Sequence, residues 1–299
     1  MHPVSDSMSG RGCVGAGCYR ALCVLALALT IILGWPRAAL AADWYVDQRT
    51  PELLAMLVCA GVVLIFVLVA RKRGRPFAIR PLAGLAAVDD ALGRATELGA
   101  PVVYVTGWGG DLARPTTMAS LAILSHVAER AALLNTRVLF PAHDPLVASA
   151  AQDTIQQAYA RAGRPDLYRP GDAAFVTQSQ LGYAAAVEGV LSRNKPGAVF
   201  LLGTFEGEAL ILAETAHNVG AVQISGTDST IQLSFFLVAC DYTLIGEELF
   251  AASAYLSQDV SMLGALRGQD VLKLIIVALL LAGFALGAAG IVQVADWLK

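Results

Sequence analysis

Hydrophobic positions along the chain fall into long uninterrupted runs as well as short periodic ones. The run from Leu53 to Ala70 contains no charged residue and is followed at once by a basic cluster, Arg71 to Arg75. A helix needs roughly 20 such residues to cross the hydrocarbon core of a bilayer, and basic residues mark its cytoplasmic end. The pattern therefore predicts a transmembrane helix over residues 52–70, with the chain that follows it in the cytoplasm.

A second run, Leu274 to Ala295, predicts another transmembrane helix, assigned to residues 273–295. It contains no charged residue and is bounded by charged residues on both sides. Residues 77–268 would then form a cytoplasmic domain, joined to the second helix by a short connection at Arg267 and Gly268. Both ends of this domain would be tied to one face of the cell's inner (plasma) membrane.

The pattern at the amino end predicts a segment that is either cleaved off or kept as a membrane anchor. Two arginines precede a 14-residue apolar run, Ala21 to Gly34, and the sequence Ala39-Leu40-Ala41 follows it. A basic start, a short apolar run and a site of small residues describe a secretory signal peptide, here residues 1–41. An uncleaved signal anchor is the alternative, and both interpretations place residues 42–51 outside the cytoplasm.

Between the two predicted spans, short β-branched runs alternate with longer helical patterns. Strands are expected at residues 101–106, 137–140, 173–176, 198–202 and 222–225. Helices are expected at residues 85–98, from 115 onward, and at 146–162, 179–191, 206–219, 231–239 and 243–256, the last one capped by Asp241. Strands that are apolar throughout are typical of a parallel sheet covered on both faces. The order predicts a Rossmann-like, three-layer α/β domain with a mainly parallel sheet.

Small polar residues follow the predicted strands, where open parallel sheets bind their ligands. Nine of them form the candidate ligand site: Thr106, Gly107, His143, Asp144, Gly203, Thr204, Ser225, Gly226 and Thr227. Such residues also cap helices and adopt positive φ at ordinary turns, so simple capping is the competing interpretation. His143 would supply an acid or a base if the site were catalytic.

No strand-to-helix turn carries a nucleotide-binding or hydrolase motif. The patterns G-x-G-x-x-G, G-x-x-x-x-G-K-[ST] and G-x-S-x-G are missing from these turns. Glu214 and His217 form one E-x-x-H pair, whereas a di-metal carboxylate site needs two, and the five cysteines include no C-x-x-C pair. We therefore expect no metal and no cofactor, and the sequence favours a protein that is not an enzyme.

Charge and composition limit the classes of partner that the chain is expected to bind. Residues 81–268 contain ten lysines and arginines against eighteen aspartates and glutamates, a net charge of −8. An acidic domain repels the phosphate backbone, so nucleic acid is excluded as a partner. The whole chain is 56% hydrophobic and only 15% charged, which fits contact with lipid. The expected partners are the lipid bilayer and either further copies of the chain or other membrane proteins.

Three stretches of the domain carry a family resemblance. They read GLAAVDDALGRATELG (Gly84 to Gly99), ILAETAHNVGAVQISGT (Ile211 to Thr227) and ACDYTLIGEELFAASAYLS (Ala239 to Ser257). Together they resemble an uncharacterised family of prokaryotic membrane-anchored proteins that is defined only by a domain of unknown function. The resemblance implies one membrane-tethered domain followed by a carboxyl-terminal span, and it supplies no activity and no catalytic residues.

These observations predict a membrane-tethered binding or scaffold domain that self-associates or is a subunit of a membrane complex. The apolar segment from Ile231 to Leu256 is the main reason, because it is richer in phenylalanine and leucine than one covering helix requires. The alternative is an enzyme or a sensor that binds a nucleotide-like small anionic ligand at the carboxyl edge of the sheet.

Overall fold

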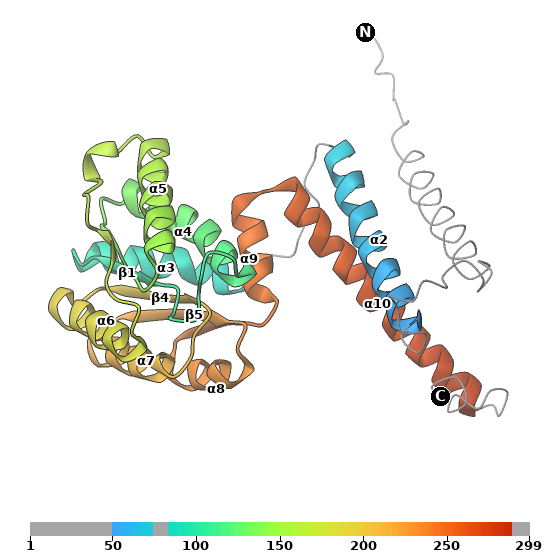
Figure 1. Ribbon diagram of the computed structural model, residues 1–299. Helices are drawn as coiled ribbons and strands as arrows, with labels where there is room; N and C mark the ends of the chain where they lie inside the picture. The colour runs from blue at the N-terminus through green and yellow to red at the C-terminus, as the bar shows by residue number, and fades with distance from the viewer. Residues whose placement is uncertain (1–49, 74–82, 289–299) are drawn as a thin grey trace, which may run out of the picture. The chain divides into compact units, whose positions relative to one another are not determined.

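The computed structural model describes residues 50–73 and 83–288, which belong to two compact units (Figure 1). One unit is Pro76–Leu263, and the other combines Met1–Arg75 with Gly264–Lys299. The predicted signal segment, residues 1–41, lies outside the described residues, as do residues 289–295 of the second predicted span.

The first unit is built on a sheet of six parallel strands in the order β3-β2-β1-β4-β5-β6. The strands are β1 (Val102–Val105), β2 (Val138–Ala142), β3 (Ala173–Phe175), β4 (Ala198–Gly203), β5 (Val222–Thr227) and β6 (Tyr242–Ile245). The chain forms one half of the sheet outward from β1 and the other half outward from β4. The predicted Rossmann-like, mainly parallel α/β domain is confirmed at this level.

Helices cover both faces of the sheet, which makes three layers (Figure 1). One layer holds α3 (Ala83–Glu97), α4 (Pro115–Leu133), α5 (Pro145–Arg161) and α9 (Glu248–Ser257); the other holds α6 (Gln180–Asn194), α7 (Glu208–Asn218) and α8 (Thr230–Ala239). A short 3₁₀ helix, η3 (Pro165–Leu167), follows α5. Each layer of helices encloses its own hydrophobic core against the sheet. Successive side chains of a strand point to opposite faces, so Tyr104 packs in the core under the first layer and Val103 in the core under the second.

Local sequence signals explain where several helices begin. The Asp144 carboxylate accepts a hydrogen bond from the Leu146 N–H and caps α5, with Pro145 as the first helical residue. Ser179 and Ser229 cap α6 and α8 in the same way. These caps place the polar loop residues at the carboxyl edge of the sheet, directly before each helix.

The segment around Asp241 differs from the prediction. Residues 242–245 form the edge strand β6 and not the start of a helix, because they pair with β5 from Ile224↔Tyr242 to Thr227↔Ile245. Asp241 caps no helix; its Oδ2 accepts a hydrogen bond from the Gln223 N–H at 2.8 Å. Ile245, within the helix predicted at residues 243–256, is instead on the edge strand and is 50% exposed.

The second unit contains α2 (Thr50–Arg73) and most of α10 (Val260–Ala288). Among the described residues, one stretch within α2, Ala55–Lys72, is long and apolar enough to cross a membrane, judged by length and composition alone. The predicted connection at Arg267 and Gly268 is not a break, because α10 continues as one helix through both residues.

Candidate functional site

The candidate site is centred where β1 and β4 lie side by side. At this point the strand order reverses direction, and open parallel sheets bind ligands beyond the carboxyl ends of such strands. The loop after β1 carries Thr106 and Gly107, and the loop after β4 carries Thr204. Gly203 ends β4 at the same point, so four of the nine candidate residues lie at the switch point of the sheet.

The two loops approach each other so closely that only glycine fits at two positions. Gly107 has φ +79° and Gly203 has φ +152°. A Cβ on Gly107 would collide with the Thr204 carbonyl oxygen, and one on Gly203 would collide with that of Thr106. Two backbone hydrogen bonds of 3.1 Å, from Thr204 N–H to Thr106 O and from Gly109 N–H to Thr204 O, hold the loops together.

Glu208, which the sequence reasoning missed, ties the β1 loop to the start of α7. Its side chain is buried, and its Oε1 accepts hydrogen bonds from the Trp108 N–H at 2.8 Å and the Glu206 N–H at 3.2 Å. The other oxygen, Oε2, accepts from Gln180 Nε2 at 3.0 Å. Three donors from three segments converge on one carboxylate, so its role is to position the loop.

Three polar atoms close to this point are left without partners. Within the described part of the chain, Thr106 Oγ1, Thr117 Oγ1 and His143 Nδ1 are buried and have no hydrogen-bond partner. Thr117 lies in the first turn of α4, before Met118, whose N–H donates to the Arg114 carbonyl. The first-turn amides and two free hydroxyls thus offer unused hydrogen-bonding capacity at the amino end of a long helix.

His143 lies beneath aromatic rings and not in open solvent. Its ring centroid is 6.5 Å from that of Trp108 and 5.8 Å from that of Tyr183. Burial lowers the pKa of His143 below its ordinary value, although the carboxylates of three neighbouring acidic residues oppose that shift. The Asp144 carboxylate caps α5, and the buried Nδ1 of His143, the acid or base expected at this edge, has no hydrogen-bond partner.

The last three candidate residues belong to β5, which is longer than predicted. Ser225 and Gly226 pair with Leu201 and Leu202 inside the sheet, and only Thr227, opposite Gly203, reaches the carboxyl edge. Ser225 Oγ contacts Thr243 Oγ1 at 3.0 Å. Ser225 and Gly226 therefore join β5 to its neighbours and do not reach the loops of β1 and β4.

The charges at this edge are mostly negative. Asp111, Asp144 and Glu206 surround the switch point, and Arg114 is the basic residue of the β1 loop. Arg114 Nε lies 4.0 Å from Asp111 Oδ1. No group of three or more histidine, cysteine, aspartate or glutamate side chains that could hold a metal ion occurs among the described residues. The arrangement can hydrogen-bond a small polar ligand, and it presents no activated nucleophile.

A second feature of the domain is the exposed apolar surface of α8. Phe236 is the buried residue of this helix and packs against Phe205 with ring centroids 5.1 Å apart. By contrast, Ile231 is 69% exposed, Leu237 54% and Val238 90%, and the helix contains no charged residue. The sequence had indicated this region by its richness in phenylalanine and leucine.

A comparison with protein families gave one match. The family model described as "Domain of unknown function (DUF6754)" matches residues 40–298. Searches of curated proteins and of solved structures each found no match to the chain. The matched range covers both units, so the family is defined over the two helices α2 and α10 together with the α/β domain.

Proposed function

The chain belongs to the family of proteins that carry this domain of unknown function, and we propose that it is a membrane-tethered scaffold whose α/β domain binds a second copy of itself through α8. The tether is α2, whose apolar stretch ends in the basic residues Arg71, Lys72 and Arg73. The domain lies on the cytoplasmic side of the inner membrane.

The observation that carries the proposal is the uncharged, outward face of α8. A helix that covers a sheet normally turns a polar face to solvent, whereas α8 exposes Ile231, Leu237 and Val238. Contiguous exposed apolar surface of this kind marks an interaction site. Burying it would release roughly 25 cal/mol for each Å² of apolar area removed from water.

Charge favours a second copy over an anionic membrane surface as the partner. Residues 228–248 contain no lysine or arginine but four acidic residues, and two of these, Asp228 and Asp241, stand just before and just after α8 in the sequence. Anionic lipid headgroups attract basic segments, so an acidic border is unfavourable for them. An uncharged helix can pack against its own copy about a two-fold axis, and anchoring both copies in one membrane raises their effective concentration.

Pairing of strands between two copies is disfavoured at β6, the edge strand that follows α8. The N–H of Ile245, on edge strand β6, already donates to Glu248 Oε2 at 3.0 Å. A carboxylate at a sheet edge blocks addition of another strand. Association therefore involves side chains of α8 and not the backbone of β6.

The test is the mass of the full-length protein in mild detergent, measured by light scattering after size-exclusion chromatography. We expect the wild type to be a dimer and Val238→Glu to be a monomer. Leu181→Glu is the matched control, because Leu181 is 75% exposed on α6, away from α8, and should remain dimeric. A monomeric wild type, or equal masses for both variants, would refute the proposal.

A small ligand at the switch point is the second candidate function, in which the chain senses or transforms a nucleotide-like anionic compound. It is favoured by the unpartnered hydroxyls of Thr106 and Thr117 at the amino end of α4. The acidic surroundings weigh against polyphosphates. A ligand at 100 times its Kd should stabilise the full-length protein by about 2.7 kcal/mol; a nucleotide and coenzyme panel that produced no thermal shift would remove this candidate.

A further inference from the structure

The helices of the second unit pack against each other at two glycines of α10. A Cβ on Gly264 would lie 2.8 Å from Ala70 Cβ and 3.1 Å from Phe66 O, and a Cβ on Gly268 would lie 3.1 Å from Val63 Cα. Small residues four positions apart let helix backbones approach this closely, as in membrane helix pairs. Val62 and Ala70, on the same face of α2, are buried.

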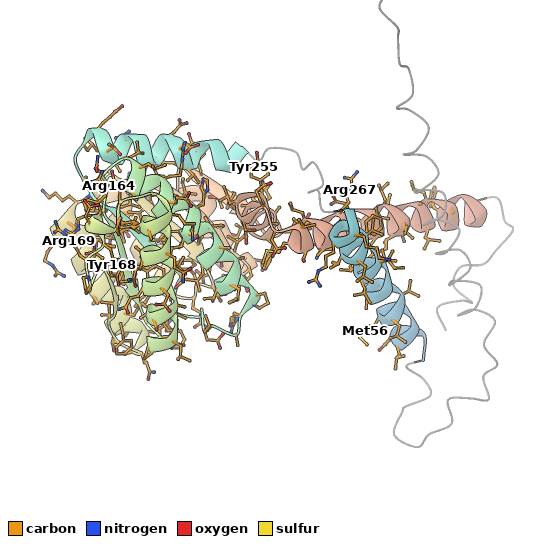
Figure 2. All side chains as sticks on the ribbon, turned by 90° about the horizontal axis from the view of Figure 1, so that it is seen from above. Met56, Arg164, Tyr168, Arg169, Tyr255 and Arg267 are labelled. Carbon is orange, nitrogen blue, oxygen red and sulfur yellow. The ribbon has the colours of Figure 1, made fainter. Side chains whose placement is uncertain are left out.

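These contacts fix the direction and the register of the pair. Moving from Gly264 to Gly268 along α10 shifts the contact from Ala70 toward Val63 along α2, so the helices are antiparallel. By the same register, Arg267 and Asp270 lie opposite positions within about two residues of the middle of Ala55–Lys72, or about 3 Å at 1.5 Å per residue. Figure 2 labels Arg267 on α10 and Met56 on α2.

With this register, the uncharged run of α2 and the uncharged run of α10 cannot both be centred in the bilayer. The apolar stretch of α2 is opposite α10 residues near 260–277, whereas the uncharged run of α10 begins only at Leu274. The uncharged run of α2, Leu53 to Ala70, is bounded closely by Glu52 before it and Arg71 after it. A bilayer that follows α2 therefore encloses the charged part of α10.

We propose that the Arg267–Asp270 pair lies inside the bilayer, level with the middle of α2, and is covered there by α10 of a second copy of the chain. The inference rests on the membrane tether and self-association proposed above. Arg267 Nη1 is 3.9 Å from Asp270 Oδ2, and the two side chains are 53% and 61% exposed, so α2 does not cover them.

Charge complementarity selects the second copy as the occupant. Charged side chains at membrane depth are costly when they face lipid and are found where they face another helix and pair with it. Arg267 and Asp270 lie one turn apart on α10 and present both signs. The equivalent face of a second α10 can therefore pair with them reciprocally.

The experiment uses the full-length protein in native membranes, with the five native cysteines replaced and one cysteine introduced at a time. Gln269→Cys reports on the depth of the pair without altering it, and Ser257→Cys, at the exposed end of α9, is the accessible control. We expect Cys at 269 to resist a membrane-impermeant maleimide applied to opened vesicles. Leu274→Cys continues the Arg267–Asp270 face one turn further along α10, where Leu274 is 70% exposed, and should form an intermolecular disulfide on oxidation. Adding Arg267→Gln and Asp270→Asn should abolish that crosslink.

Each contrary outcome identifies what is wrong. Labelling at 269 as fast as at 257 would place the pair outside the bilayer and overturn the inference. Protection without a crosslink would exclude the second copy as the covering partner, which also overturns it. Either failure alongside a monomeric Val238→Glu variant would leave the association through α8 standing, so the two proposals are tested separately.

Discussion

Removing the Glu208 carboxylate should destabilise the domain far more than removing an exposed carboxylate from the same helix. Glu208→Ala leaves the N–H groups of Trp108 and Glu206 and the amide of Gln180, all in partly buried hydrogen bonds, without their acceptor. Each unsatisfied buried donor costs about 1–3 kcal/mol. Allowing for partial solvation of the loop, we expect a loss of about 3 kcal/mol in the free energy of unfolding, because two backbone donors are affected at once.

The measurement is thermal unfolding of the full-length protein in detergent, followed by far-ultraviolet circular dichroism. For a domain of this size about 3 kcal/mol corresponds to a fall in Tm of about 6–12 °C. Glu208→Gln keeps one oxygen to accept from the two N–H groups and should lose about 1 kcal/mol. Glu214→Ala removes an exposed carboxylate from α7 and should change stability by less than about 0.5 kcal/mol. Equal Tm values for Glu208→Ala and Glu214→Ala would refute the assigned role.

Two further predictions concern Gly203, at the end of β4, and Cys240, at the end of α8. Gly203→Ala should lose about 2–5 kcal/mol of stability, because an unfavourable φ and a collision with the Thr106 backbone add together. Gly220→Ala, at φ +77° with open space around it, should lose only about 1–2 kcal/mol, and equal urea midpoints for the two variants would contradict the close approach of the loops. Burial raises the pKa of the Cys240 thiol to about 11, so its reaction with a maleimide should increase as the pH approaches that value. Cys240 Sγ lies 3.5 Å from Gln223 Oε1, and a plateau already reached near pH 9, as for a solvated thiol, would show that the thiol is not buried against this side chain.

The elements that sequence reasoning located correctly are those with an unambiguous local pattern. The runs at β1 and β4 are apolar throughout and bounded by glycine or proline, and helices α5 and α6 begin at side-chain caps visible in the sequence. The four-residue segment Tyr242–Ile245 was misread because a short apolar run before acidic residues fits a helix as well as a strand. Pairing with β5 decides between them, and pairing is not a local property.

In the candidate site, too, some residues could be found from the local sequence and others could not. Thr106, Gly107, Gly203 and Thr204 were found from their positions after strands, and the structure brings them into contact. Thr117 and Glu208 gave no comparable signal, because a threonine in a first helical turn and a glutamate at a helix start are ordinary. They matter only because β1 and β4 are neighbours, a consequence of strand order.

By itself the sequence determined the βα alternation, the parallel class of sheet, the polar residues at strand ends and the long apolar runs, since each depends on neighbours along the chain. The tertiary structure alone decided the strand order, the edge position of β6, the hydroxyls left without partners, the exposure of α8 and the register of α2 against α10. These depend on which distant segments meet, and many such pairings are compatible with one hydrophobic pattern. Only packing of the whole chain selects among them.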